Sequence, residues 1–141
     1  MIELIKHEDF GLLKEMIQKY EFHTIDFSYK SIDKETAPFI AKALIGLDIK
    51  VLNLGYNQLG LEGALGLVDY LKDTQVTSLD LTQNLIGEGV VELIKQLTNT
   101  SIQELKLAYN RIGAKGIALI KPLVNGSNIK IDLSHNLAYG V

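Results

Sequence analysis

The sequence of 141 residues contains no cysteine, which excludes disulfides, thiolate metal sites and thiol nucleophiles. Arginine is nearly absent too, since Arg111 stands alone beside thirteen lysines. Bidentate recognition of phosphate and guanine relies on arginine, so this scarcity argues against nucleic-acid binding. The formal net charge of -3 adds no positive field that would attract a phosphate backbone. We therefore expect no nucleic-acid partner.

Long apolar runs are also missing from the sequence. No stretch approaches the roughly 20 consecutive apolar residues that a membrane-spanning helix needs. Charged residues interrupt the first nine positions too early for a secretory signal. We expect a single soluble domain over residues 1–141, without a membrane partner, that works in a cytoplasm.

A short unit with the pattern L-x-L-x-x-N repeats along most of the chain. Its four clear copies end at Asn57, Asn84, Asn110 and Asn136. These asparagines are 27, 26 and 26 residues apart, which lies within the period of about 20 to 29 residues of leucine-rich repeats. A fainter copy over residues 25–30 has Lys30 in the asparagine position. The period predicts about five repeats over residues 22–141, the last of them incomplete.

Each part of the unit has a physical role. The alternation in L-x-L places Leu52 and Leu54 on one face of a short strand, and Asn53 and Gly55 on the other. The chain must turn sharply after the strand, and an asparagine can satisfy the backbone donors and acceptors that such a turn leaves unpaired. We therefore predict a structural ladder of four asparagines: Asn57, Asn84, Asn110 and Asn136.

The segment after each asparagine predicts a helix. Residues 57–64 and 110–117 share the pattern N-x-[L/I]-G-x-x-G-[A/I], and helical spacing of apolar residues follows it. Residues 1–21 lie outside the repeat, and Asp9 is a plausible N-cap there. The apolar side of the helix it starts would carry Leu12, Leu13, Met16, Ile17 and Tyr20. A solenoid needs such a cover over its first repeat, so we predict an N-terminal helical cap.

These motifs and their period resemble the ribonuclease-inhibitor-like class of leucine-rich repeats. The resemblance implies an α/β right-handed solenoid, with a parallel sheet on the concave face and helices on the convex face. The lysine-rich, cysteine-free repeats are also similar to leucine-rich-repeat proteins that intracellular bacteria inject into host cells. That similarity implies an effector that binds a host protein after delivery into the host cytosol.

Two columns of side chains are candidate partner-binding residues. The position between the two apolar residues of each L-x-L unit faces away from the core. It carries Asp26, Asn53, Asp80, Lys106 and Asp132. The position before each asparagine carries Tyr29, Tyr56, Tyr109 and His135, with Gln83 at the third repeat. Tyrosine is enriched at protein interfaces, which favours a binding ridge. The alternative is that the rings only cover the leucine layer at the mouth of the turn.

Several chemical motifs are better explained by structure than by catalysis. Glycines 60, 63 and 66 recur in register as a helix-start feature and lack the lysine of a phosphate loop. His7, His23 and His135 are spread over the cap, the first repeat and the last, which does not suit a zinc site. We therefore expect no catalytic residue, no metal, no cofactor and no enzymatic activity.

A protein-interaction module is the leading functional hypothesis. The concave face, about 20 Å wide, offers only about 400 Å², half of the roughly 800 Å² that each partner contributes to a standard interface. One alternative is a GTPase-activating-type regulator on the same solenoid, with Arg111 as the trans-acting arginine. Another is that the chain is the N-terminal fragment of a longer repeat protein.

The last repeat predicts self-association. Its strand has no following helix to cover it, so apolar side chains there would face water. These side chains are Ile131, Leu133, Leu137 and Tyr139. A second copy of the chain could cover them through a two-fold contact.

Overall fold

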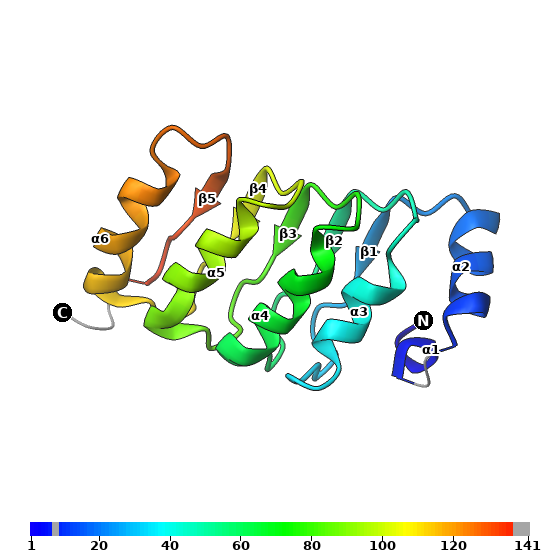
Figure 1. The fold of residues 1–141 in the computed structure, drawn as a ribbon. Coiled ribbons are helices and arrows are strands. Elements are labelled where there is room, and N and C mark those ends of the chain that lie inside the picture. Colours follow the sequence, from blue (N-terminus) through cyan, green and yellow to red (C-terminus); the bar gives the residue numbers. More distant parts are fainter. Residues whose placement is uncertain (7–8, 137–141) are drawn as a thin grey trace.

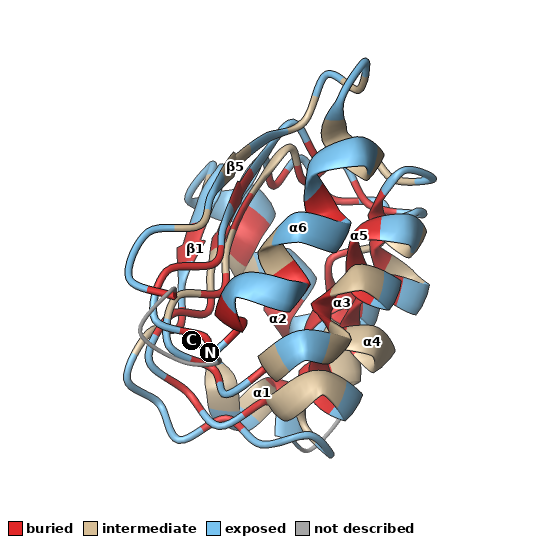
Figure 2. Ribbon diagram, turned by 90° about the vertical axis from the view of Figure 1, so that its left-hand side faces the viewer, coloured by how far each residue is buried: buried red, intermediate tan, exposed pale blue. Residues whose placement is uncertain are grey.

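The computed structural model describes residues 1–6 and 9–136, which form a solenoid of two layers (Figure 1). A five-stranded parallel sheet follows chain order, with β1 Thr24–Asp26, β2 Val51–Asn53, β3 Ser78–Asp80, β4 Glu104–Lys106 and β5 Lys130–Asp132. The connecting helices are α3 Ala37–Ala43, α4 Gly60–Leu71, α5 Val90–Leu97, which follows the 3₁₀ turn η1 Gly87–Gly89, and α6 Gly113–Val124. These helices lie together on one face of the sheet (Figure 2). The predicted α/β leucine-rich-repeat solenoid is confirmed.

The core is a stack of the repeated apolar positions. Leu52 of β2 pairs in register with Ile25 of β1 and Leu79 of β3, and each of the three is at most 1% exposed. The second apolar position of each repeat, two residues on, is buried in the same way from Phe27 to Leu107. Because identical positions stack on each other, every strand contributes to one continuous core.

The fifth repeat is less well covered. Ile131 and Leu133 are only half-buried, whereas their counterparts in the second to fourth repeats are buried. In the part of the chain that the structure describes, these two side chains have a neighbouring repeat on one side alone. Leu137 and Tyr139, which belong to the same prediction, lie outside the described residues.

The two glycines of the G-x-x-G pattern serve different purposes. Gly60 has a φ of +63°, a conformation that L side chains rarely adopt. Gly63 lies against the preceding repeat, where a Cβ atom would come within 2.9 Å of the Lys34 Cα atom. The first glycine therefore starts the helix, and the second lets adjacent repeats approach closely.

The N-terminal cap consists of two helices, α1 Ile2–Lys6 and α2 Phe10–Lys19. Asp9 caps α2 as predicted, since its carboxylate accepts from the Leu12 backbone N–H at 3.4 Å. Leu13 and Ile17 of α2 are buried, as is Ile5 of the unpredicted α1. Leu12 and Tyr20 were expected on the apolar side of α2, but they are 45% and 59% exposed because α2 covers the first repeat along a narrower stripe.

A column of hydroxyl groups, which the sequence patterns did not reveal, links α4, α5 and α6 to the strands that follow them. The Thr74 hydroxyl donates to the Leu71 carbonyl at the end of α4 (2.8 Å) and accepts from the Val76 backbone N–H (3.4 Å). Thr100 and Ser127 make the same two bonds in the next two repeats. These hydroxyls satisfy a carbonyl that the last turn of each of these three helices leaves without an intrahelical partner.

Candidate binding surface

The asparagine side chains lie beneath the turns that follow the strands. Asn110 donates from Nδ2 to the Leu107 carbonyl of its own repeat (3.1 Å) and to the Leu81 carbonyl of the preceding repeat (2.8 Å). Its Oδ1 atom accepts from the backbone N–H groups of Asn84 (2.9 Å) and Ile86 (3.3 Å), which also belong to the preceding repeat. One side chain thus holds its own turn and ties it to the neighbouring turn.

The other three asparagines are used in the same way. Asn57, Asn84 and Asn136 each donate to carbonyls of their own and the preceding repeat and accept from the preceding repeat. All four are buried, and among the described residues no buried side-chain nitrogen or oxygen lacks a hydrogen-bond partner. The asparagine ladder therefore fixes the turns along the carboxyl edge of the sheet by hydrogen bonds within and between repeats.

The candidate strand column lies in register across the open face of the sheet. Asp26, Asn53, Asp80, Lys106 and Asp132 are paired neighbours from β1 to β5. Four of them also stabilise the turn that follows the strand. In each of these four repeats a side-chain oxygen accepts a hydrogen bond of 2.9 Å from the backbone N–H two residues further along the chain. Lys106 has no acceptor and is the exception. This structural role was not predicted from the sequence, although Asp and Asn are the residues that favour such a turn.

Two carboxylates of this column are held in their charged form. The pKa of Asp26 is lowered because its carboxylate accepts from the Ser28 hydroxyl (2.7 Å) and backbone N–H. The pKa of Asp132 is lowered by the corresponding bonds from Ser134 and by the positive charge of Lys106. Both groups present negative charge on the open face at neutral pH.

The candidate aromatic column forms two pairs. Tyr29 and Tyr56 stack with ring centroids 4.5 Å apart and planes inclined by 10°, and Tyr109 and His135 stack at 4.3 Å and 4°. Gln83 lies at the level between the pairs. The tyrosine rings remain accessible, with exposed fractions of 71% for Tyr29, 38% for Tyr56 and 45% for Tyr109. We refer to Tyr29/Tyr56 and Tyr109/His135 as the first and second aromatic pairs.

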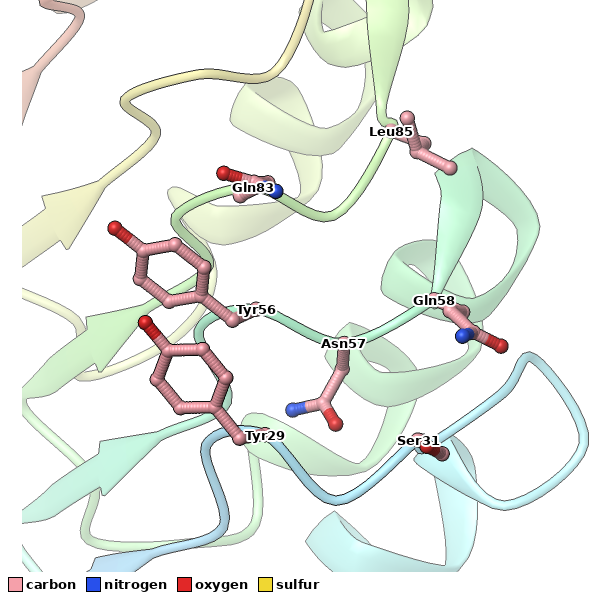
Figure 3. Close-up of a pocket in the computed structure, with 7 residues that line it drawn as sticks. All are labelled: Tyr29, Ser31, Tyr56, Asn57, Gln58, Gln83 and Leu85. Carbon is pink, nitrogen blue, oxygen red and sulfur yellow. The ribbon is translucent and has the colours of Figure 1, made fainter.

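The backbone holds these rings in an unusual conformation. Every residue of the aromatic column has a φ between 51° and 59°, in the left-handed region that non-glycine residues seldom occupy. Because the same φ recurs at all five levels, it belongs to the turn that the ladder stabilises. The hydroxyl groups of Tyr29 and Tyr56 lie side by side (Figure 3), and the charge of the adjacent Tyr29 phenol is the chief cause that raises the pKa of Tyr56.

A pocket of about 420 Å³ lies on the ladder beside the first aromatic pair (Figure 3). We call it the tyrosine pocket. It is formed by residues at the asparagine position and on either side of it in the first three repeats: Tyr29, Ser31, Tyr56, Asn57, Gln58, Gln83 and Leu85. None of the described residues that line it carries a charged side chain. The sequence predicted the tyrosine side of this pocket but not the opposite side, which is formed by Ser31, Gln58 and Leu85, the residues just after the asparagine position of each repeat.

A second hollow, of about 510 Å³, lies between the end of α2 and the loop after α3. His23 Nδ1 is 3.3 Å from one carboxylate oxygen of Asp48, and Lys50 Nζ is 3.2 Å from the other. These side chains are about half exposed, so the ion pairs contribute little to stability. Asp48 already pairs with Lys50 and contacts His23, so the hollow is a weaker candidate than the tyrosine pocket.

The described part of the chain offers neither a metal-binding cluster nor a membrane-spanning helix. Within residues 1–6 and 9–136, no three His, Cys, Asp or Glu side chains gather in a way that could hold a metal ion. His7 lies outside that range. None of the described helices combines the length and apolar character that crossing a bilayer requires.

Comparisons with known proteins agree with the fold. Residues 48–68 and 98–121 match the family model of the leucine-rich repeat. No curated protein matches the chain significantly. Among solved structures, the chain is similar to actin-binding site 2 of leiomodin-1, with a TM-score of 0.71 and 22% identity over 97% of this chain and 79% of that chain. At this identity the similarity shows a shared leucine-rich-repeat fold.

Proposed function

We propose that this leucine-rich-repeat protein is a protein-interaction module that binds its partner through the open sheet face and the two aromatic pairs beside it. The observation that carries the proposal is the exposure of Tyr29, Tyr56 and Tyr109 on turns that the asparagine ladder holds in place. The leiomodin-1 domain of similar fold is an actin-binding site, which supports protein binding by such a scaffold.

The rigidity of the surface favours binding. Stacked rings on a hydrogen-bonded turn have already lost much of their conformational freedom in the free protein, so less entropy is lost when a partner docks. Tyrosine adds a large contact area with a polar tip. The strand column alone provides about 400 Å². The tyrosine pocket enlarges this area past the edge of the sheet, towards the size of a standard interface.

Removing a ring should weaken binding without unfolding the protein. We expect Tyr56→Ala and Tyr109→Ala each to change the melting temperature little and to weaken partner capture at least about fivefold, as for an exposed aromatic hot spot. The measurement is quantitative capture of proteins from a eukaryotic lysate by the immobilised chain. Tyr20→Ala is the matched control, because Tyr20 is 59% exposed on the N-terminal cap and is not part of the proposed binding surface.

Two results would argue against this surface. If the Tyr56→Ala and Tyr109→Ala variants lose their fold, the rings serve to cover the leucine layer. If both variants stay folded and capture the same proteins as the Tyr20→Ala control, the aromatic pairs take no part in binding.

Narrower proposals concern the biological setting and Arg111. The lysine-rich, cysteine-free composition supports an effector that binds a host protein in the host cytosol. Arg111 supports a GTPase-activating role less well, because its exposed turn position and its φ of 57° recur at Ser31 and Leu85. The repeat itself accounts for this geometry, so protein binding without a catalytic arginine is the function we favour.

We further propose that two copies of the chain contact each other through β5. The half-buried Ile131 and Leu133 lie there, and backbone groups along the outer side of such a strand can pair with another chain. Sedimentation over a wide concentration range should show dimers at high concentration, and Leu133→Glu should shift the equilibrium to monomer. A wild-type chain that stays monomeric at every concentration would contradict the proposal.

A further inference from the structure

We propose that the tyrosine pocket binds a proline-rich segment of the partner in the polyproline II conformation. This inference rests on the proposed function, since it names the part of a partner that the surface recognises. It draws on three features of the pocket: its chemistry, its spacing and the state of its backbone.

The chemistry of the pocket suits an uncharged ligand that offers carbonyl groups. Tyrosine hydroxyls and the amides of Gln58 and Gln83 can donate hydrogen bonds, and no charged side chain lines the pocket. A charged peptide side chain would lose water there without gaining a counter-charge. Polyproline II has no internal hydrogen bonds, so its carbonyls are free to accept, and aromatic-lined grooves are its usual docking surface.

The spacing of the repeats suits the polyproline II helix better than a β-strand. Adjacent strands are about 4.8 Å apart, so the first and third repeats present Tyr29 and Gln83 about 9.6 Å apart. One turn of polyproline II is three residues, or about 9.3 Å, which brings the same side of the ligand back at every second repeat. An extended strand repeats after about 6.6 to 6.8 Å and falls out of register.

The backbone of the pocket cannot bind a peptide by strand addition. The Tyr56 backbone N–H already donates to the Thr82 carbonyl (2.7 Å), and the Gln58 N–H donates to the Ile32 carbonyl (2.9 Å). The Ile32 N–H donates to the Asn57 side chain at 3.0 Å. These turns therefore offer side-chain donors and aromatic rings in place of a free main-chain edge, which is the mode in which polyproline II segments are recognised.

Titration with a defined peptide tests the inference. We would add an end-blocked ten-residue polyproline peptide to the ¹⁵N-labelled chain and follow the backbone amide signals by NMR. Saturable shifts are expected at Tyr29, Tyr56 and Gln83, while a Gly-Ser peptide of the same length produces none. Tyr56→Ala should weaken the binding at least about fivefold. Tyr56→Phe, which keeps the ring and removes one donor, should weaken it less, and Tyr20→Ala should leave it unchanged.

A second variant guards against loss of the turn conformation. Asparagine tolerates the left-handed region, so Tyr56→Asn removes the ring while the backbone stays compatible with a φ of 57°. The inference is overturned if polyproline leaves the pocket signals unshifted, or if it binds the folded Tyr56→Asn variant as well as the wild type. Lysate capture distinguishes the two levels: with polyproline inactive but capture still dependent on Tyr56, only the ligand class is wrong. If capture also proves independent of Tyr56 and Tyr109, the proposed function fails as well.

Discussion

Asn84→Ala should destabilise the protein by several kcal/mol, whereas its neighbour Gln83→Ala should leave stability nearly unchanged. The Asn84 amide is fully buried and donates to the carbonyls of Leu54 (2.8 Å) and Thr82 (3.2 Å). Its oxygen accepts from the Leu59 backbone N–H at 3.3 Å. Alanine removes all three bonds. The Leu54 and Thr82 carbonyls keep bonds from Asn57 and Tyr56, so each lost bond there costs about 0.5 to 1.5 kcal/mol, whereas the buried Leu59 N–H loses its acceptor at a cost of about 1 to 3 kcal/mol.

An effect of this size is large because folded proteins are only marginally stable. Loss of about 3 to 5 kcal/mol is a large part of the 5 to 15 kcal/mol that typically separates the folded and unfolded states. For a chain of this length each kcal/mol corresponds to roughly 4 °C, so the melting temperature should fall by more than about 10 °C. Gln83→Ala trims an exposed side chain and should change stability by less than about 0.5 kcal/mol.

Thermal unfolding followed by circular dichroism measures both variants. Gln83→Ala is a close control, since it adjoins Asn84 in the same turn and replaces an amide by the same methyl group. Equal melting temperatures for the two variants would show that the ladder contributes little to stability.

The repeated features of this protein could be predicted from the sequence because they are local and periodic. The two-residue alternation around Leu52 and Leu54 indicates a strand with one buried face, and the spacing from Ala64 to Leu71 indicates a helix. Both periods depend on backbone geometry that each residue carries with it. The recurrence of Asn57 and its counterparts then places the strands side by side.

Features that depend on contacts between repeats could not be predicted from the sequence. The asparagine pattern predicted hydrogen bonds inside each turn but not the bonds to the preceding turn, because no local pattern reports what a neighbouring repeat presents. The hydroxyl column of Thr74, Thr100 and Ser127 escaped notice because Thr and Ser are common in loops for many reasons. Helix α1, with a single buried residue, Ile5, is too short to produce a recognisable periodic pattern.

The candidate site was predicted in part for the same reason. Both columns could be read from the repeat, since each occupies one position in every unit. The stacking of the rings in two pairs follows from Gln83, a single departure from the aromatic pattern. The tyrosine pocket needs the three-dimensional course of the turn, which brings Ser31 and Leu85 opposite the tyrosines. The path of the turn depends on residues with a positive φ, such as Ser31 and Leu85, and these residue types have no strong preference for that conformation from which it could be predicted.

Gly63→Ala should destabilise the protein, although the same change normally stabilises a helix. Gly63 is buried within α4, and an added Cβ would lie 2.9 Å from the Lys34 Cα atom and 3.2 Å from the Leu59 Cβ atom. A backbone atom at that distance can move only if the first and second repeats separate. Overpacking of this kind costs about 1 to 3 kcal/mol, which outweighs the gain of about 0.5 to 1 kcal/mol from replacing glycine within a helix.

Gly11→Ala provides the matched control. Gly11 lies near the start of α2, is exposed, and has no atom within 4 Å of the position its Cβ would take. The substitution there should stabilise the protein by about 0.5 kcal/mol, mainly by restricting the unfolded chain. In urea unfolding, the midpoint concentration should therefore be lower than wild type for Gly63→Ala and slightly higher for Gly11→Ala. The dependence of the unfolding free energy on urea concentration should be similar in all three proteins. A midpoint for Gly63→Ala at or above that of the wild type would mean that the repeats have room for a methyl group, and that their close approach does not explain the second glycine of the pattern.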